Sequence, residues 1–255
     1  MPKHPALKGR SGRVPALKGR SGPVEADGYR STVHDIDKTE PVAFVGHQGI
    51  TIVGDCRGDR DAPTVLLLHG GGQTRHSWGG TAALLARQGW CAITLDARGH
   101  GERDWHDPGD YSLTAFALDV REVARVFPVT PFVVGASLGG CTAMLLEGEI
   151  SPGATEGIVL VDVVPQLNET GTDRIQEFML ARVDEGFATL EEARDAIAAY
   201  NAFRPPPSDL EGLKKNLRLG EDGRWRWHWD PRFVPTGPGG RGPSEITDEN
   251  RMRQA

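Results

Sequence analysis

The chain has 255 residues, of which 38% are hydrophobic and 25% are charged, and its formal net charge is −6 at pH 7. This length and composition are typical of a soluble globular protein with one sizeable core. No apolar stretch reaches the roughly 20 residues that a membrane-spanning helix needs, and the N-terminus lacks the apolar core of a secretory signal, so we expect no membrane partner and a cytoplasmic location.

The N-terminal region is basic and repetitive. Residues 1–24 hold six basic side chains and no acidic one, which leaves the rest of the chain with a net charge of −12. Residues 5–12 recur letter for letter as residues 15–22, and a repeat with so few apolar residues cannot bury a core. We therefore expect residues 1–40 to form a disordered basic tail, with an electrostatic tether to an anionic partner or a transit peptide as alternatives. The acidic remainder argues against a nucleic-acid partner.

The three cysteines are Cys56, Cys91 and Cys141, an odd number without the spacing of metal ligands. We expect neither a disulfide framework nor a metal site, and we expect all three side chains to pack as small apolar residues. No cofactor is expected either.

From about Pro41 onward, the first elements alternate β-rich and helical runs. Residues 42–46 and 50–54 predict a β-hairpin. Residues 64–69 form a continuous apolar run, as in a strand that is buried on both faces. Residues 78–88 have helical composition, and residues 90–95 form another buried strand.

The following elements continue this alternation. Ser112 can cap a helix whose apolar residues recur at helical spacing as far as Phe127. An apolar run at residues 131–134 leads into Gly135-Ala136-Ser137-Leu138-Gly139-Gly140, then a helix-forming run at 141–146 and a strand at 157–164. Because strands that alternate with helices imply parallel crossovers, we predict an α/β fold with a mostly parallel sheet and flanking helices.

The turn around Ser137 is the most informative motif. A strand that turns directly into a helix forces its central residue into a strained backbone geometry and requires small neighbours. The turn raises the Ser137 hydroxyl above the sheet and aims the helix N-terminus at the space in front of it.

Three motifs together resemble the serine branch of the α/β-hydrolase fold superfamily. They are His69-Gly70-Gly71-Gly72, Asp96-Ala97-Arg98-Gly99-His100-Gly101 and the run from Gly135 to Gly139, each at a predicted strand end. They lie in the expected order within residues 41–168, which we predict to be the hydrolase core. The resemblance implies that Ser137 is the nucleophile toward an ester or amide of a small molecule, forming an acyl-enzyme. It also implies that the backbone amides of Gly71 and Leu138 bind the substrate oxyanion.

We expect the other polar residues of these motifs to have mostly structural roles. His69 and His100 are expected to order their loops, and Asp96 to order its own turn through hydrogen bonds to backbone groups. Asp162, at the end of the sixth strand, is the acid placed nearest the serine and is the candidate catalytic acid. His228 is a candidate for a displaced base.

Residues 169–234 resemble the helical cap that covers the active site in many members of the superfamily. Two helices are predicted within residues 172–200 and a short one at 210–219. Trp225, Trp227 and Trp229 alternate with polar residues, which places the indoles on one side of an extended segment. Two interpretations stay open: the indoles form an aromatic wall for a ligand, or they pack the cap against the core. Residues 235–255 are expected to form a flexible C-terminal segment.

In the superfamily, two more strands follow the cap and carry an acid and a histidine, and neither strand is recognisable in this sequence. We therefore expect a C-terminally truncated chain in which the strand at 158–163 leaves an apolar sheet edge exposed. Three functions stay open: a serine hydrolase, inactive if truncation removes its base; a cofactor-free haloperoxidase or perhydrolase; and a ligand-binding protein without turnover. The oligomeric state stays open too.

Overall fold

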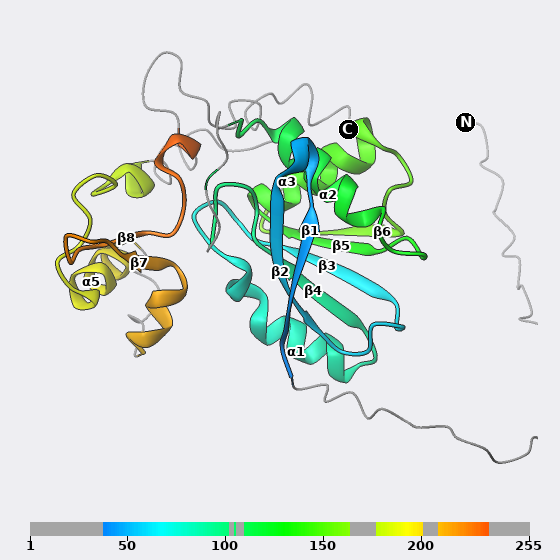
Figure 1. Ribbon diagram of the computed structural model, residues 1–255, viewed down its shortest axis with the longest axis horizontal. Helices are drawn as coiled ribbons and strands as arrows, with labels where there is room; N and C mark the ends of the chain where they lie inside the picture. Colours follow the sequence, from blue (N-terminus) through cyan, green and yellow to red (C-terminus); the bar gives the residue numbers. More distant parts are fainter. Residues whose placement is uncertain (1–37, 102–104, 106–109, 164–176, 201–208, 235–255) are drawn as a thin grey trace, which may run out of the picture. The chain divides into compact units, whose positions relative to one another are not determined.

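The computed structural model describes residues 38–101, 105, 110–163, 177–200 and 209–234. Within them, six strands form one sheet in the order β1-β2-β4-β3-β5-β6 (Figure 1). The strand pairs β3–β4, β3–β5 and β5–β6 are parallel, whereas β2 pairs antiparallel with β1 and β4. The predicted α/β fold with a mostly parallel sheet is confirmed. The predicted terminal segments, residues 1–37 of the tail and 235–255, lie outside the described residues, as does the expected boundary at 168/169.

The N-terminal hairpin forms as predicted. Strand β1 (Glu40–Val45) is joined to β2 (Thr51–Arg57) by a 3-10 turn at His47–Gly49. The turn needs positive φ angles at two successive residues, 61° at Gln48 and 78° at Gly49. The second strand continues beyond the predicted end at residue 54, because it pairs with β4 as well as with β1.

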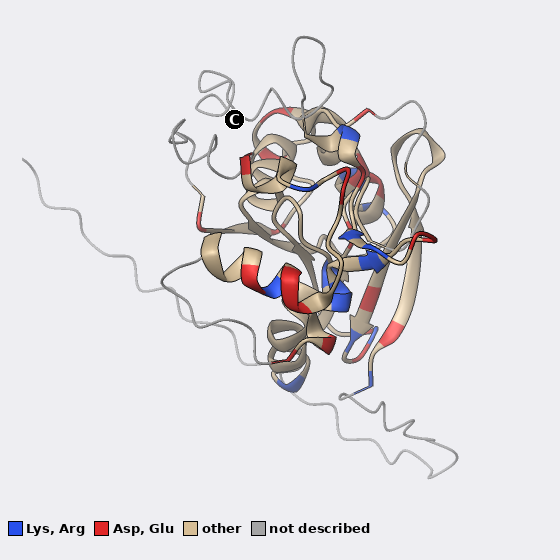
Figure 2. Cartoon of the chain, turned by 90° about the vertical axis from the view of Figure 1, so that its left-hand side faces the viewer, with Lys and Arg blue, Asp and Glu red and all other residues tan. Residues whose placement is uncertain are grey.

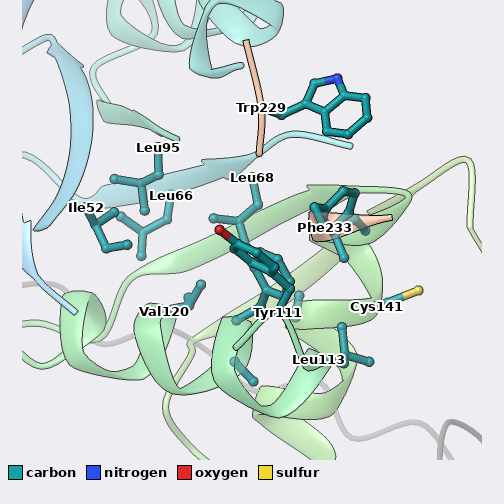
Figure 3. Packing of buried hydrophobic residues seen from close by; sticks show 14 of the residues in the cluster. Ile52, Leu66, Leu68, Leu95, Tyr111, Leu113, Val120, Cys141, Trp229 and Phe233 are labelled. Atoms are coloured by element: carbon teal, nitrogen blue, oxygen red, sulfur yellow. The ribbon is translucent and has the colours of Figure 1, made fainter. Parts of the chain in front are cut away.

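All five residues of strand β3 (Thr64–Leu68) are buried. This explains why apolar and polar residues do not alternate in its sequence. Val65 and Leu67 join a cluster with Ala82 of helix α1 (Gly79–Arg87). Leu66 and Leu68 point to the opposite face, into a second cluster with helices α2 (Leu113–Ala124) and α3 (Leu138–Leu145). The sheet is therefore covered on both faces, by α1 on one and by α2 and α3 on the other (Figures 1 and 3).

The other parallel strands are β4 (Cys91–Leu95), β5 (Phe132–Ala136) and β6 (Gly157–Val161). The α2 helix begins as predicted, with the Ser112 hydroxyl accepting the N–H of Ala115 at 3.2 Å. It ends before the predicted Phe127, because the N–H groups of Val126 and Phe127 donate three residues back, to Val123 and Ala124. Such tightening is common in a last turn that approaches a proline.

Strand β6 is an edge of the sheet among the described residues. Its side chains Val159 and Val161 are 52% and 38% exposed. The predicted apolar edge is therefore present in this part of the structure.

The region after β6 differs from the predicted helical cap. Residues 177–180 and α5 (Leu190–Tyr200) are helical, and residues 172–176 of the predicted first helix lie outside the described residues. The predicted helix at 210–219 is wrong. It is replaced by a 3-10 turn, η4 (Glu211–Lys215), and strand β7 (Leu217–Leu219), which pairs antiparallel with β8 (Trp225–Trp227).

The physical reason for the difference is a turn between the two strands. The Gly220 N–H donates to the Arg224 carbonyl at 2.8 Å, and Gly223 has a φ of 75° that favours glycine. Pairing Leu217 with Trp227 then buries both side chains, which overrides the helical tendency of the residues before the turn.

All three cysteines are free and buried, as expected from their sequence pattern. Across the part of the chain that the structure describes, no group of histidine, cysteine and acidic residues has the arrangement of a metal site. Within the same residues, no helix is both long enough and apolar enough to cross a membrane.

Candidate active site

Ser137 lies in the turn between β5 and α3, with a φ of 47° and a ψ of −113°. Its side chain is exposed, although its neighbours Gly135, Leu138 and Gly139 are buried. The Ser137 N–H donates to the Val161 carbonyl at 3.2 Å, and its carbonyl accepts from the Cys141 N–H at 2.9 Å. The strained turn predicted from the sequence is therefore present, and it is held by hydrogen bonds to β6 and α3.

The small residues around Ser137 are required by close packing. A Cβ atom added at Gly135 would lie 2.3 Å from the Gly139 carbonyl oxygen, and one added at Gly139 would lie 2.5 Å from the Leu68 carbonyl oxygen. The atoms that such a Cβ would meet belong to the backbone, which cannot move aside as the end of a flexible side chain can. The glycines thus let α3 approach β5 and β3 closely enough to form the turn.

The glycine loop after β3 lies beside the serine. A Cβ atom added at Gly70 would lie 3.4 Å from the Ser137 Cβ. The Gln73 side chain closes the loop, because its Oε1 accepts the Gly70 N–H at 3.1 Å. Among the described residues, no acceptor is hydrogen-bonded to the backbone N–H of Gly71 or Leu138. These two N–H groups are available to an external acceptor.

His69 and His100 use both ring nitrogens on backbone groups, as their structural interpretation predicts. The Nδ1 atoms lie 2.8 Å from the Gly70 carbonyl for His69 and 3.0 Å from the Arg98 carbonyl for His100. The Nε2 atoms accept the N–H of Ala97 at 3.0 Å and of Gly72 at 3.1 Å, respectively. Burial lowers the pKa of His69, and it lowers the pKa of His100 to about 3. Both rings are therefore neutral, fixed parts of the scaffold.

Asp96 orders a neighbouring turn rather than its own, which differs from the prediction. Its carboxylate accepts the Arg75 backbone N–H at 2.7 Å and the Arg75 Nη1 at 2.5 Å. Arg75 also contacts Asp55, with an Nε to Oδ2 distance of 3.1 Å. This buried network holds the 3-10 turn η2 (Arg75–Trp78), which follows the glycine loop.

Asp162 follows β6 directly and has a φ of 54°. Because Ala136 of β5 pairs with Val161 of β6, Ser137 and Asp162 leave the sheet at neighbouring positions of one edge. Both are exposed. No histidine of the described residues is hydrogen-bonded to Ser137, so the structure brings the serine and the acid to one edge without placing a base between them.

Sequence reasoning named Trp229 and His228 of the segment that follows β8 but missed the contacts that its backbone, Asp230 and Phe233 make with the core. The Gly101 N–H donates to the His228 carbonyl at 2.8 Å, and the Asp230 N–H donates to the Gly99 carbonyl at 2.7 Å. Asp230 also accepts hydrogen bonds from the Tyr111 hydroxyl and from Arg232. The only signal in the sequence was Asp230-Pro231, which is typical of a helix start, and indeed a 3-10 turn, η5 (Pro231–Phe233), begins there.

Phe233 brings this segment to the glycine loop. A Cβ atom added at Gly71 would lie 3.4 Å from the Phe233 ring. The same ring packs edge-on against His100, with 4.7 Å between the centroids, and near Tyr111 and Trp229 (Figure 3). The segment 228–234 thus forms one wall of the site.

A cavity of about 240 Å³ lies next to the glycine loop. It is bounded by Gly71 and Gly72 on one side and by side chains of the region 178–229 on the other. The candidate site therefore combines an exposed serine, two backbone N–H groups without an acceptor among the described residues, and a mostly apolar cavity next to the glycine loop.

Comparison with known proteins finds an alpha/beta hydrolase family model and esterases. A family model described as alpha/beta hydrolase fold matches residues 63–195, just over half of the chain. Esterase Rv0045c of Mycobacterium tuberculosis is 32% identical over 174 residues, which cover 66% of this chain and 57% of that protein. Protein phosphatase methylesterase 1 of Homo sapiens is 32% identical over 138 residues, covering 52% of this chain and 36% of that protein. The chain thus spans less than two thirds of the length of each of these relatives.

Solved structures agree with the topology. An alpha/beta hydrolase from Novosphingobium aromaticivorans aligns with a TM-score of 0.62 at 24% identity, over 83% of this chain and 77% of that one. A structure of Rv0045c aligns with a TM-score of 0.55 at 27% identity, over 83% of this chain and 70% of that one. The likeness to the first structure concerns the fold alone.

Proposed function

The chain belongs to the alpha/beta hydrolase fold family, and on that premise we propose that it is a serine hydrolase that cleaves small-molecule esters through an acyl-enzyme. The observation that carries the proposal is the backbone of Ser137, whose φ of 47° at the β5–α3 turn exposes the side chain beside the glycine loop. Related esterases support the reaction class. The region 177–234 is then the cap over this site.

In the proposed reaction, the Ser137 hydroxyl oxygen attacks the ester carbonyl carbon. The electron pair of the carbonyl moves onto its oxygen, and the N–H groups of Gly71 and Leu138 donate to that oxyanion. Collapse of the intermediate breaks the ester C–O bond, and the leaving oxygen takes up the proton that the Ser137 hydroxyl gave up, so the alcohol departs. Water later releases the acid from the serine ester and returns a proton to the Ser137 oxygen. Gly71 and Leu138 suit this role because no acceptor among the described residues is bonded to their N–H groups.

Asp162 is the proposed acid, since it leaves β6 at the position next to Ser137. Its carboxylate would orient an imidazole rather than attack the substrate. His69 and His100 are unsuited as the base because backbone groups occupy both of their ring nitrogens. His228 stays a candidate, since its segment borders the glycine loop.

The test combines a reactive probe with a Ser137→Ala variant. A fluorophosphonate should label the parent protein at Ser137 and leave Ser137→Ala unlabelled, and hydrolysis of p-nitrophenyl acetate should fall by roughly 10⁴-fold or more in the variant. A folded parent protein that is neither labelled nor active would contradict the proposal. Unchanged hydrolysis in His228→Ala would exclude that residue as the base.

The oxyanion assignment is tested with two variants at Gly71. Gly71→Pro removes the N–H and should lower kcat by roughly 10²- to 10³-fold. Gly71→Ala keeps the N–H, and its added methyl would only touch the Phe233 ring at an ordinary 3.4 Å, so its loss should be much smaller. Equal losses in both variants would refute a role for this N–H.

A ligand-binding protein without turnover is the second candidate. The observation in its favour is that none of the described histidines is hydrogen-bonded to Ser137. This candidate predicts ligand binding in the cavity with no fluorophosphonate labelling, and labelling at Ser137 would exclude it.

A further inference from the structure

The cavity beside the glycine loop has walls from parts of the chain that are far apart in sequence. Gly71 and Gly72 face Met179, Ile197 of α5, and the indoles of Trp227 and Trp229. Its volume of about 240 Å³ is slightly below the range of roughly 300–1,000 Å³ that is usual for small-molecule pockets. The space suits a compact group rather than a long chain.

The lining contains no acidic, lysine, arginine or histidine side chain among the described residues. Acidic and basic residues are instead interspersed along the ribbon on the face that Figure 2 presents. Helix α5 itself contains Glu191, Glu192 and Asp195. An ion that entered the cavity would lose its water and find no counter-charge, which is costly. The cavity therefore favours an uncharged occupant.

The cavity is not wholly apolar, because two amide side chains line it, Gln73 and Asn216. The orientation of the Gln73 amide is fixed, since its Oε1 accepts the Gly70 N–H at 3.1 Å. Its NH₂ group is left as a donor without a partner among the described residues. The Asn216 amide is tied to the Thr74 hydroxyl at 3.0 Å. The cavity therefore offers a hydrogen-bond donor to its occupant.

Met179 controls the size of the cavity next to the loop. A Cβ atom added at Gly72 would lie 3.1 Å from the Met179 Cε and 3.7 Å from the Trp229 Nε1. The thioether and the indole thus lie next to Gly72 of the glycine loop. Methionine is the most adaptable of the apolar side chains, so its replacement changes the available space without introducing charge.

We propose that this cavity binds a compact, uncharged, branched or cyclic apolar group that carries a hydrogen-bond acceptor, and that Met179 sets the largest group admitted. The inference rests on the proposed function only in assigning this group to the ester substrate. Binding of the group itself requires neither Ser137 nor turnover.

The experiment uses the Ser137→Ala protein and three ligands of nearly one shape: cyclohexyl methyl ketone, ethylcyclohexane and cyclohexanecarboxylate. Binding is followed by tryptophan fluorescence, because Trp227 and Trp229 line the cavity. The ketone should bind saturably. The hydrocarbon, which lacks an acceptor, should bind up to about tenfold more weakly, and the carboxylate at least about tenfold more weakly.

The matched variants are made in the same Ser137→Ala background. Met179→Trp should weaken ketone binding at least about tenfold, whereas Met179→Ala should admit bulkier ketones that the parent rejects. Leu84→Ala, at a 62% exposed position of α1, is the control and should bind like the parent. Carboxylate binding as tight as ketone binding, or no effect of Met179→Trp in a protein with the parent's circular dichroism, would overturn the inference.

The outcome is separable from that of the proposed function. Ketone binding without fluorophosphonate labelling of the parent supports the cavity assignment and contradicts the hydrolase. Labelling at Ser137 without ketone binding supports the hydrolase and overturns the cavity assignment.

Discussion

The backbone of Ser137 is costly, because a non-glycine residue at a φ of 47° loses roughly 1–3 kcal/mol relative to a relaxed conformation. The surrounding contacts enforce it. The Ser137 N–H is tied to β6 and its carbonyl to α3, and a side chain at Gly135 or Gly139 would collide with backbone atoms. The exposed position of the Ser137 side chain thus depends on its neighbours as much as on the serine.

Gly139→Ala should therefore destabilise the protein by several kcal/mol, because its Cβ would lie 2.5 Å from the Leu68 carbonyl oxygen. The control is Gly80→Ala in α1, where a Cβ would meet nothing within 4 Å. That change should stabilise the protein by up to about 1 kcal/mol, since alanine favours helix more than glycine. Urea unfolding of both variants checks the pair, and equal effects would contradict close packing at the turn.

The buried His100 ring predicts a dependence of stability on pH. Its pKa is about 3 in the folded protein, against 6.5 ordinarily, so between these values the unfolded chain binds the extra proton. Stability is unaffected by this group above about pH 6.5 and falls as pH is lowered, by about 1.4 kcal/mol per pH unit down to about pH 3.

His100→Gln removes this proton while keeping a side chain that can accept the Gly72 N–H. The variant should be less stable than the parent at pH 8, but it should lose about 2 kcal/mol less than the parent between pH 7 and pH 5. Denaturant unfolding at the two pH values measures the difference. A parent and a variant with the same pH dependence would show that His100 is not buried as a neutral ring.

At the scale of elements, the sequence predicts the core well because its patterns are local. Residues 64–69 lack alternation because β3 is buried on both faces, and the Ser112 cap and the glycine turn at Ser137 each lie within a few residues. The hairpin β7–β8 was missed because the helical composition of residues 210–219 outweighed its one local signal, the turn at Gly220 and Gly223. Leu217 pairs with Trp227 ten positions later, and a helical pattern does not reveal that contact.

The candidate site shows the same difference between local motifs and contacts that are distant in sequence. The serine and the glycine loop were predictable because each is a short motif at a strand end. The contact between Phe233 and Gly71, like the hydrogen bond from Tyr111 to Asp230, joins residues more than 100 positions apart. Such contacts depend on how the whole chain folds, so the periodicity of the sequence does not predict them.

Strand β6 carries a prediction of its own, because an exposed apolar edge is a template for association. Val159→Lys, at a 52% exposed position, should reduce concentration-dependent association and leave the unfolding free energy within about 0.5 kcal/mol of the parent. Val129→Lys makes the same change in charge at a 70% exposed valine outside the strands and should leave association unchanged. Sedimentation velocity compares the association of the two variants. Equal reductions in both would show that the added charge, and not the change at the β6 edge, weakens association.

At the scale of the whole described structure, the segment 228–234 fastens the part of the chain after β6 to the core. Asp230 is buried and links Tyr111, just before α2, with Arg232 and with the Gly99 carbonyl. Burial tends to raise the pKa of Asp230, but hydrogen bonds from Arg232 and Tyr111 outweigh it and hold this pKa below its usual value. Burial and the bond to Asp230 raise the pKa of Tyr111, so the hydroxyl remains a donor.

Tyr111→Phe removes one hydrogen bond to a buried carboxylate and should cost about 1.5–3 kcal/mol at pH 7. Asp222→Asn, which breaks an exposed ion pair with Arg226, is the control and should cost much less than Tyr111→Phe. Because the pKa of Asp230 is lowered on folding, its contribution is complete above about pH 4 and is lost as pH falls through the folded value. An Asp230→Asn protein should therefore lose less stability than the parent on acidification below pH 4. If its unfolding free energy instead follows the parent's at every pH, the part of the chain after β6 is fastened to the core by apolar packing around Phe233 and Trp229 and not by this carboxylate.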